Sequence, residues 1–146
     1  MRRKNTTTEM MMGYMCSALL ELMLEKDYAK ISIGEIAKKA GVDRSSYYRH
    51  FKSKEDIISF FFDMVLKESL DGFTNLSSID FTLYIHSIYM AFYNYKKEVL
   101  LIYRSNLSSL LLDVLSKRFQ FSEIAIEFPL TKQYELSYII GGIYNN

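Results

Sequence analysis

Residues 32–51 carry the start and stop signals of two short helices that follow one another with only a tight turn between them. Ser32 and Glu35 have the spacing of a capping box, in which each side chain satisfies a free backbone N–H at the beginning of a helix. Gly41 is placed to end that helix in the left-handed conformation, which glycine adopts without steric cost. Asp43 is then placed to cap a second helix of about eight residues. Helices this short depend on packing against longer neighbours.

Longer helices are predicted on both sides of this pair. Thr6 and Glu9 form another capping box, and Ser53 is placed to cap a helix that stops at Asp71 and Gly72. Six Gly, one Pro and no continuous alternation of apolar and polar residues argue against a β sandwich or barrel. We therefore predict an all-α fold, with helices over residues 6–26, 33–40, 44–51, 54–70, 81–95 and 98–119, joints near Lys96 and Asn106, and a last helix after Thr131.

Basic residues are concentrated around the two short helices. Residues 30–54 contain seven basic and two acidic side chains. Residues 57–146 contain seven basic and nine acidic side chains, together with 17 of the 22 aromatic ones. The basic region suits an anionic partner, and the aromatic, slightly acidic region is expected to have a different function. Because a basic helical face taken alone is more often a solvated surface, the charge needs support from the spacing of the residues.

Two helices of this length joined by a glycine turn have the dimensions of a helix-turn-helix, whose second helix enters the major groove of DNA. The stretch ISIGEIAKKAGVDRSSYYRHFKSKEDII also resembles the amino-terminal DNA-binding domain of TetR-family (TetR/AcrR) bacterial regulators. The resemblance covers about residues 10–60, and the matching residues are Ile33, Ile36, Ala37, Ala40, Gly41, Val42, Ser46, Tyr48, His50, Phe51, Lys54 and Ile57. It implies a three-helix, homeodomain-like helix-turn-helix domain over residues 1–53. Residues 54–146 would then be a TetR-like helical effector-binding and dimerisation domain that lacks the family's last helices.

The resemblance also implies DNA-contacting roles for individual side chains. Helix N-termini and positive charge favour phosphate groups, and the candidates for phosphate binding are Ser32, Ser46, Tyr48, His50 and Lys54. The candidates for reading base edges in the major groove are Arg44, Ser45, Tyr47 and Arg49. A weaker candidate for the minor groove is the basic tail of Arg2, Arg3 and Lys4, with a disordered terminus as the alternative.

A TetR-like second domain commonly encloses a pocket for a small molecule. The side chains that would line it here are Phe60, Phe61, Met64, Tyr84, His86, Tyr89, Phe92, Tyr93, Tyr103 and Phe119. Aromatic side chains at helical spacing are more often plain core, and that alternative holds for each of them. A flat aromatic or apolar compound is the effector that such a lining favours.

The last predicted helix contains two adjacent glycines, which would cost about 2 kcal/mol relative to alanines unless close packing compensates. In a TetR-like dimer this helix packs against its mate across a twofold axis. The candidates for a homodimer interface are therefore Tyr138, Gly141 and Gly142. Fraying of the helix end is the alternative.

These features favour a sequence-specific transcriptional repressor that binds double-stranded DNA at a palindromic operator as a homodimer and is released by its ligand. The alternative is an effector-independent helix-turn-helix activator or adaptor whose aromatic domain binds another protein. Two histidines, one cysteine and no phosphate loop, hydrolase elbow or metal-ligand spacing argue against an enzyme, a metal site and a cofactor. The single Cys16, the lack of a secretory signal and the lack of about 20 consecutive apolar residues predict a cytoplasmic protein with no membrane contact.

Overall fold

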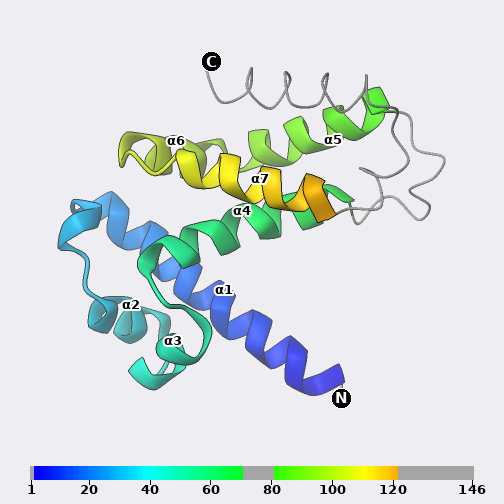
Figure 1. The fold of residues 1–146 in the computed structure, drawn as a ribbon. Helices are drawn as coiled ribbons and strands as arrows, with labels where there is room; N and C mark the ends of the chain where they lie inside the picture. Colours follow the sequence, from blue (N-terminus) through cyan, green and yellow to red (C-terminus); the bar gives the residue numbers. More distant parts are fainter. Residues whose placement is uncertain (1, 71–80, 122–146) are drawn as a thin grey trace. The chain divides into compact units, whose positions relative to one another are not determined.

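The computed structural model of the chain describes residues 2–70 and 81–121. Every regular element within these two ranges is a helix (Figure 1), which confirms the all-α prediction. The elements are α1 (Arg2–Glu25), the short 3-10 helix η1 (Tyr28–Lys30), α2 (Ile33–Ala40), α3 (Arg44–His50), α4 (Lys54–Leu70), α5 (Phe81–Asn94), α6 (Lys96–Arg104) and α7 (Ser109–Phe121).

The chain divides into two compact units. The first contains α1, η1, α2, α3, the start of α4 and all of α6, and the second contains the rest of α4 together with α5 and α7. In the structure α4 is divided between the two units and α6 packs against α1 in the first unit, while the predicted boundary after residue 53 stays a prediction. The short helices therefore lie in a unit that also contains α6.

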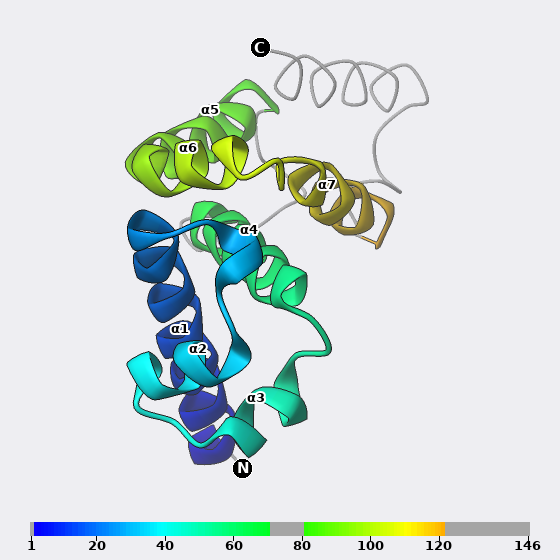
Figure 2. The ribbon, with the colours of Figure 1, turned by 90° about the vertical axis from the view of Figure 1, so that its left-hand side faces the viewer.

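The core of the first unit explains how such short helices are held. Helix α1 contributes a buried apolar face, represented by Met15 and Leu19, to this core, and α2 contributes Ile36 and Ala37. Figure 2 shows α2 lying against α1, with α3 following after the turn. Burying large apolar side chains contributes about 1.5–3 kcal/mol each, which offsets the low intrinsic stability of helices of seven or eight residues.

Both ends of α2 form as the sequence predicts. The Ser32 hydroxyl accepts a hydrogen bond from the Glu35 backbone N–H (3.3 Å), and the Glu35 carboxylate accepts one from the Ser32 backbone N–H (2.9 Å). At the other end, Gly41 has φ 67° and its N–H donates to Lys38, while the Val42 N–H donates back to the Ala37 carbonyl (3.0 Å). These two bonds form a Schellman turn that fixes the direction in which the chain enters α3.

Three predicted helix starts have different outcomes. Ser53 accepts a hydrogen bond from the Asp56 N–H (3.2 Å), so the predicted cap of α4 is confirmed. Asp43 occupies the N-cap position of α3, but its side chain makes no capping hydrogen bond there. The predicted start at Thr6 is wrong, because α1 begins at Arg2 and Thr6 lies inside the helix.

We expect a Gly41→Ala substitution to lower the free energy of unfolding by about 1–2 kcal/mol, because a Cβ is disfavoured at a positive φ. Gly34→Ala is the matched control within the same helix. An added Cβ at residue 34 would meet only the Ser32 Oγ at 3.9 Å, so this change should stabilise the chain by up to about 1 kcal/mol. Urea denaturation of both variants measures the difference, and equal effects would contradict the assigned role of Gly41.

The second unit has its own apolar core and an apolar outer face. Ile88 and Ala91 of α5 are buried, and the ring of Phe92 packs against that of Phe62 at 6.2 Å between centroids. The large exposed apolar side chains of α5 are Leu83, Tyr89, Met90 and Tyr93. Among the described residues, no single helix is long and apolar enough to cross a membrane, although α6 and α7 pass that test together as a broken pair.

Candidate nucleic-acid interface

Helix α3 has one buried side and one exposed side. Tyr47 faces the interior, where its ring packs against Phe51 at 6.0 Å between centroids, and Phe51 in turn contacts Phe60. The exposed side chains of α3 are Arg44, Ser45, Tyr48 and Arg49. The pairs 44/48 and 45/49 are four residues apart and therefore neighbours on the helix surface. The aromatic contacts thus orient α3 so that a basic, hydroxyl-rich face points to solvent.

Arg44 and Tyr48 interact across this exposed face. The Arg44 Nη2 donates to the Tyr48 hydroxyl at 3.3 Å, and the guanidinium carbon lies 5.8 Å from the centroid of the Tyr48 ring. The Tyr48 ring is itself held edge-on to the buried Tyr47 ring at 5.2 Å. A cation over an aromatic face at an exposed site is stabilised by about 0.5–1 kcal/mol, enough to restrict the guanidinium without fixing it.

Two candidate residues on α3 are buried. Tyr47 is fully buried, so its assignment to base reading is corrected: the side chain anchors α3 in the core. Ser46 is only 8% exposed, and its role as a phosphate ligand stays a prediction. The Tyr47 hydroxyl has no hydrogen-bond partner within the described part of the chain, and burial raises its pKa.

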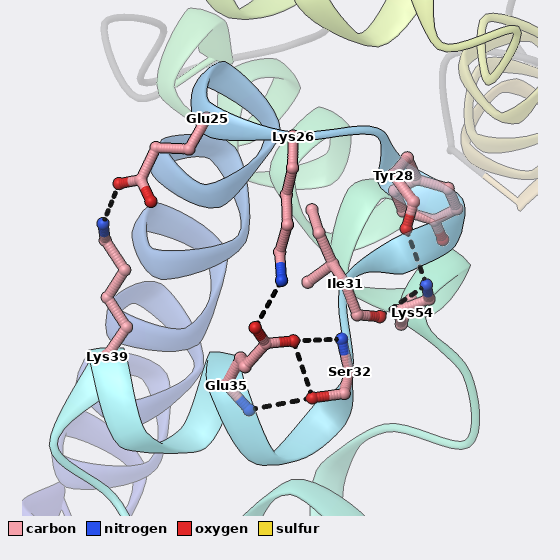
Figure 3. Close-up of polar contacts among 8 residues, drawn as sticks. All are labelled: Glu25, Lys26, Tyr28, Ile31, Ser32, Glu35, Lys39 and Lys54. Carbon is pink, nitrogen blue, oxygen red and sulfur yellow. Dashed lines mark hydrogen bonds and ion pairs between the residues drawn. The ribbon is translucent and has the colours of Figure 1, made fainter.

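Lys54 is also used differently from the prediction. Its ammonium donates to the backbone carbonyls of Tyr28 and Ile31, both at 2.8 Å, and lies 4.4 Å from the centroid of the Tyr28 ring. Figure 3 shows these contacts at the first residue of α4. The side chain therefore ties α4 to the segment before α2, and its role as a phosphate ligand stays a prediction.

Ser32 and His50 are the other phosphate candidates. Ser32 is exposed at the N-terminus of α2, although its hydroxyl also donates to the Glu35 carboxylate at 2.8 Å. His50 is half-buried in the last turn of α3. Together with the exposed Tyr48, both side chains are reachable from solvent.

Ion pairs within the first unit determine which lysine and arginine side chains remain available to an external anion. Lys39 contacts Glu25 at 2.7 Å and Glu21 at 3.4 Å, and these carboxylates raise the pKa of Lys39. Lys26 forms an ion pair with Glu35 (Figure 3). The exposed basic side chains on α3 and directly after it are Arg44, Arg49 and Lys52, and Lys38 is exposed in the last turn of α2. The charge excess read from the sequence is therefore concentrated around α3.

Glu35 links the end of α1 to the start of α2, and the contacts that it makes there lower the pKa of its carboxyl group. Its carboxylate accepts hydrogen bonds from the Lys26 ammonium and from the backbone N–H and hydroxyl of Ser32, which together lower its pKa from 4.5 to about 2. A carboxylate with a lowered pKa stabilises the folded state above its unfolded pKa, and this contribution is lost as the pH falls.

We therefore expect the free energies of unfolding of the wild type and a Glu35→Gln variant to converge as the pH falls from about 4.5 to 2, and to differ most above pH 4.5. Urea denaturation at a series of pH values measures this. Lys26→Met should weaken the same pH dependence, because it removes the largest cause of the shift. A constant difference between wild type and Glu35→Gln over this pH range would contradict the account.

The side chains predicted to line an effector pocket differ in exposure, and the pocket stays a prediction. Tyr89, Tyr93 and Tyr103 are at least half exposed, with the first two rings stacked on the surface of α5 at 6.1 Å. His86 is exposed, Phe61 is buried in the core, and Phe60, Met64 and Phe92 are half-buried. Phe60, Phe61 and Tyr103 also belong to the first unit, whereas Met64, His86, Tyr89, Phe92 and Tyr93 belong to the second. The side chains of Tyr84 and Phe119 lie outside the described structure.

Two other predicted sites fall outside what the structure describes. The dimer candidates Tyr138, Gly141 and Gly142 lie beyond residue 121, and the side chains of Arg2, Arg3 and Lys4 are not described although their backbone starts α1. Both sites stay predictions.

Comparison with known proteins supports the assignment of the first unit. Residues 16–59 match the family of bacterial regulatory proteins named tetR. The chain is 37% identical over 54 residues to the HTH-type transcriptional regulator EthR of Mycolicibacterium smegmatis. These 54 residues cover 37% of this chain and 25% of that protein. It is 34% identical over 62 residues to the uncharacterized HTH-type transcriptional regulator YxbF of Bacillus subtilis. These 62 residues cover 42% of this chain and 16% of YxbF.

These matches cover a quarter or less of each relative, and no solved structure matches the chain significantly. The matched residues run from the middle of α1 to the first turns of α4, which is the part that holds and presents α3. Residues 16–59 therefore form a helix-turn-helix domain of the tetR type, the part that this chain shares with these transcriptional regulators.

Proposed function

We propose that the protein regulates transcription by inserting α3 into the major groove of a specific DNA sequence. The observation that carries the proposal is the exposed face of α3, where Arg44, Ser45 and Arg49 point to solvent while Tyr47 is anchored in the core. The major groove is about 12 Å wide and admits one helix. Arginine and serine side chains can donate hydrogen bonds to base edges there, and arginine favours guanine.

Contacts to phosphates would position this helix without choosing a sequence. Ser32 at the N-terminus of α2, with Tyr48 and His50 on α3, are the side chains proposed for this role. The exposed Lys52 adds positive charge at the end of α3. Neutralising phosphates releases counterions, so binding should weaken steeply as the salt concentration rises.

In its finer form, the proposal is a cytoplasmic repressor without enzymatic activity that binds a palindromic operator as a homodimer and is released by a small molecule. Two α3 helices of such a dimer would lie about 34 Å apart, one turn of DNA. The family match supports this form. An adaptor that recruits another protein is the second candidate, favoured by the exposed apolar side chains Leu83, Tyr89, Met90 and Tyr93 on α5.

Selection from a library of random duplexes tests the proposal. The purified full chain is incubated with the library, and bound DNA is sequenced after several rounds. We expect one enriched sequence, arranged as an inverted repeat with half-sites about one helical turn apart. A bound pool as diverse as the starting library would overturn sequence-specific regulation, and an enriched single half-site would overturn the dimeric form.

A further inference from the structure

We propose that a polar groove between the end of α1, η1 and the end of α6 binds a small organic anion with a carboxylate group and an apolar body. The groove lies entirely within the first unit and has a volume of about 530 Å³. One wall is formed by residues 23–29, and the other by Leu101 with residues 104–106. This size is within the range of small-molecule sites, and none of the predicted pocket residues lines it.

The groove is lined by two acidic and two basic side chains, of which the arginine is the one proposed to attract an anion. Three ionised side chains of the first wall already have partners: Glu25 contacts Lys39, Lys26 contacts Glu35, and Asp27 contacts Lys30 at 3.3 Å. Arg104 on the opposite wall is exposed and has no ion-pair partner within the part of the chain that the structure describes. A guanidinium offers a planar pair of donors that matches a carboxylate, so this side chain is the expected anion ligand.

The backbone at the end of α6 is compatible with a nearby anion. Asn106 has φ 59°, its N–H donates to Tyr103 at 3.0 Å, and the Leu107 N–H donates to the Ile102 carbonyl at 3.2 Å. This Schellman turn satisfies carbonyl oxygens that would otherwise repel negative charge at a helix C-terminus. It also holds Asn106 on the same wall as Arg104, where its side-chain amide is a second donor.

The apolar part of the ligand has matching surfaces. Leu24, on the first wall, is 76% exposed and offers an apolar surface to a ligand in the groove. The Tyr28 ring and Leu101 are only partly buried and line the same space. Covering these side chains would remove apolar area from water at about 25 cal/mol per Å², so an anion with a hydrocarbon body is favoured over inorganic phosphate.

The groove is also connected to the DNA-binding helices. Lys26 lines it and contacts Glu35 in the capping box of α2, while Tyr28 lines it and accepts a hydrogen bond from Lys54 at the start of α4. The Tyr28 hydroxyl also donates to Glu55 at 2.8 Å. A ligand that displaces residues 26–28 would therefore shift the scaffold that presents α3. This consequence rests on the proposed function, but binding in the groove does not.

The test is an NMR titration of the ¹⁵N-labelled full chain with benzoate, compared with its neutral match benzamide. We expect millimolar benzoate to shift the backbone signals of residues 23–29 and 101–106, and benzamide to bind at least about tenfold more weakly. Arg104→Gln should weaken benzoate binding by a similar factor. Lys97→Gln, which removes an exposed charge from the same helix, should leave it unchanged. Equal binding of benzoate and benzamide, equal effects of the two variants or no localised shifts would overturn the site.

A second measurement uses a duplex recovered from the random library. Saturating benzoate should change the affinity for this duplex at least threefold, and the duplex should change the benzoate affinity by the same factor. An unchanged DNA affinity would overturn the coupling to α3. If no sequence-selective duplex is recovered while benzoate still binds, the proposed function fails and the groove remains a binding site.

Discussion

An Arg44→Ala variant is expected to bind its preferred duplex about 30-fold more weakly, a loss of about 2 kcal/mol, and to lose base preference at a single position in each half-site. Arg44 lies in the first turn of α3, its guanidinium is exposed, and its contact with Tyr48 restricts it on the outward face. These are the properties required for a bidentate contact with guanine O6 and N7. Binding measurements on all single-base variants of the selected duplex test this expectation.

Lys52→Ala is the matched control for this prediction. Lys52 is exposed just after α3, so its loss should weaken all duplexes evenly and reduce the salt dependence by about one phosphate contact. Arg44→Ala should instead leave the salt dependence nearly unchanged. Uniform weakening of every duplex by Arg44→Ala would show that Arg44 binds a phosphate and not a base.

A Lys54→Met variant is expected to lose about 2–4 kcal/mol of unfolding free energy, because a charged donor to two carbonyls and a cation over an aromatic ring are removed together. Methionine keeps much of the apolar stem. At a temperature where the variant is folded, its base preference and salt dependence should equal those of the wild type. Denaturant unfolding and salt titrations of DNA binding provide both readouts.

Lys52→Met changes the same residue type on an exposed site two positions earlier, and its stability should stay within about 0.5 kcal/mol of the wild type. If Lys54→Met retained full stability but reduced the salt dependence by one unit, Lys54 would be a phosphate ligand after all. The structural role assigned to its contacts with Tyr28 and Ile31 would then be wrong.

The elements fixed by local interactions were the ones predictable from the sequence. The capping box of Ser32 and Glu35 and the turn at Gly41 involve residues only a few positions apart, and both have the predicted geometry. The joint near Asn106 is confirmed by its positive φ between α6 and α7. The predicted helix start at Thr6 was wrong because a capping sequence is equally compatible with the interior of a helix that starts earlier.

The side chains of the interface were harder to assign because distant packing decides them. Tyr47 and Tyr48 are adjacent and chemically alike, and a seven-residue helix has too few turns for its sequence pattern to show which ring faces inward. Contact with Phe51 buries the ring of Tyr47. The Lys54 ammonium donates hydrogen bonds to the carbonyls of residues 28 and 31, more than 20 positions away. A local sequence pattern does not predict hydrogen bonds between residues so far apart.

Site-directed disulfide cross-linking tests most directly whether α3 enters the major groove. A Ser45→Cys variant is mixed with the selected duplex carrying a thiol tether in either the major or the minor groove. The native Cys16 is buried and burial raises the pKa of its thiol to about 12, so it should not compete. Leu24→Cys, an exposed site at the end of α1, is the control.

We expect Ser45→Cys to cross-link to the major-groove tether within the half-site, and Leu24→Cys to cross-link to neither tether. Cross-linking of Ser45→Cys to the minor-groove tether, or equal and weak reaction of both variants with both duplexes, would contradict insertion of α3 into the major groove.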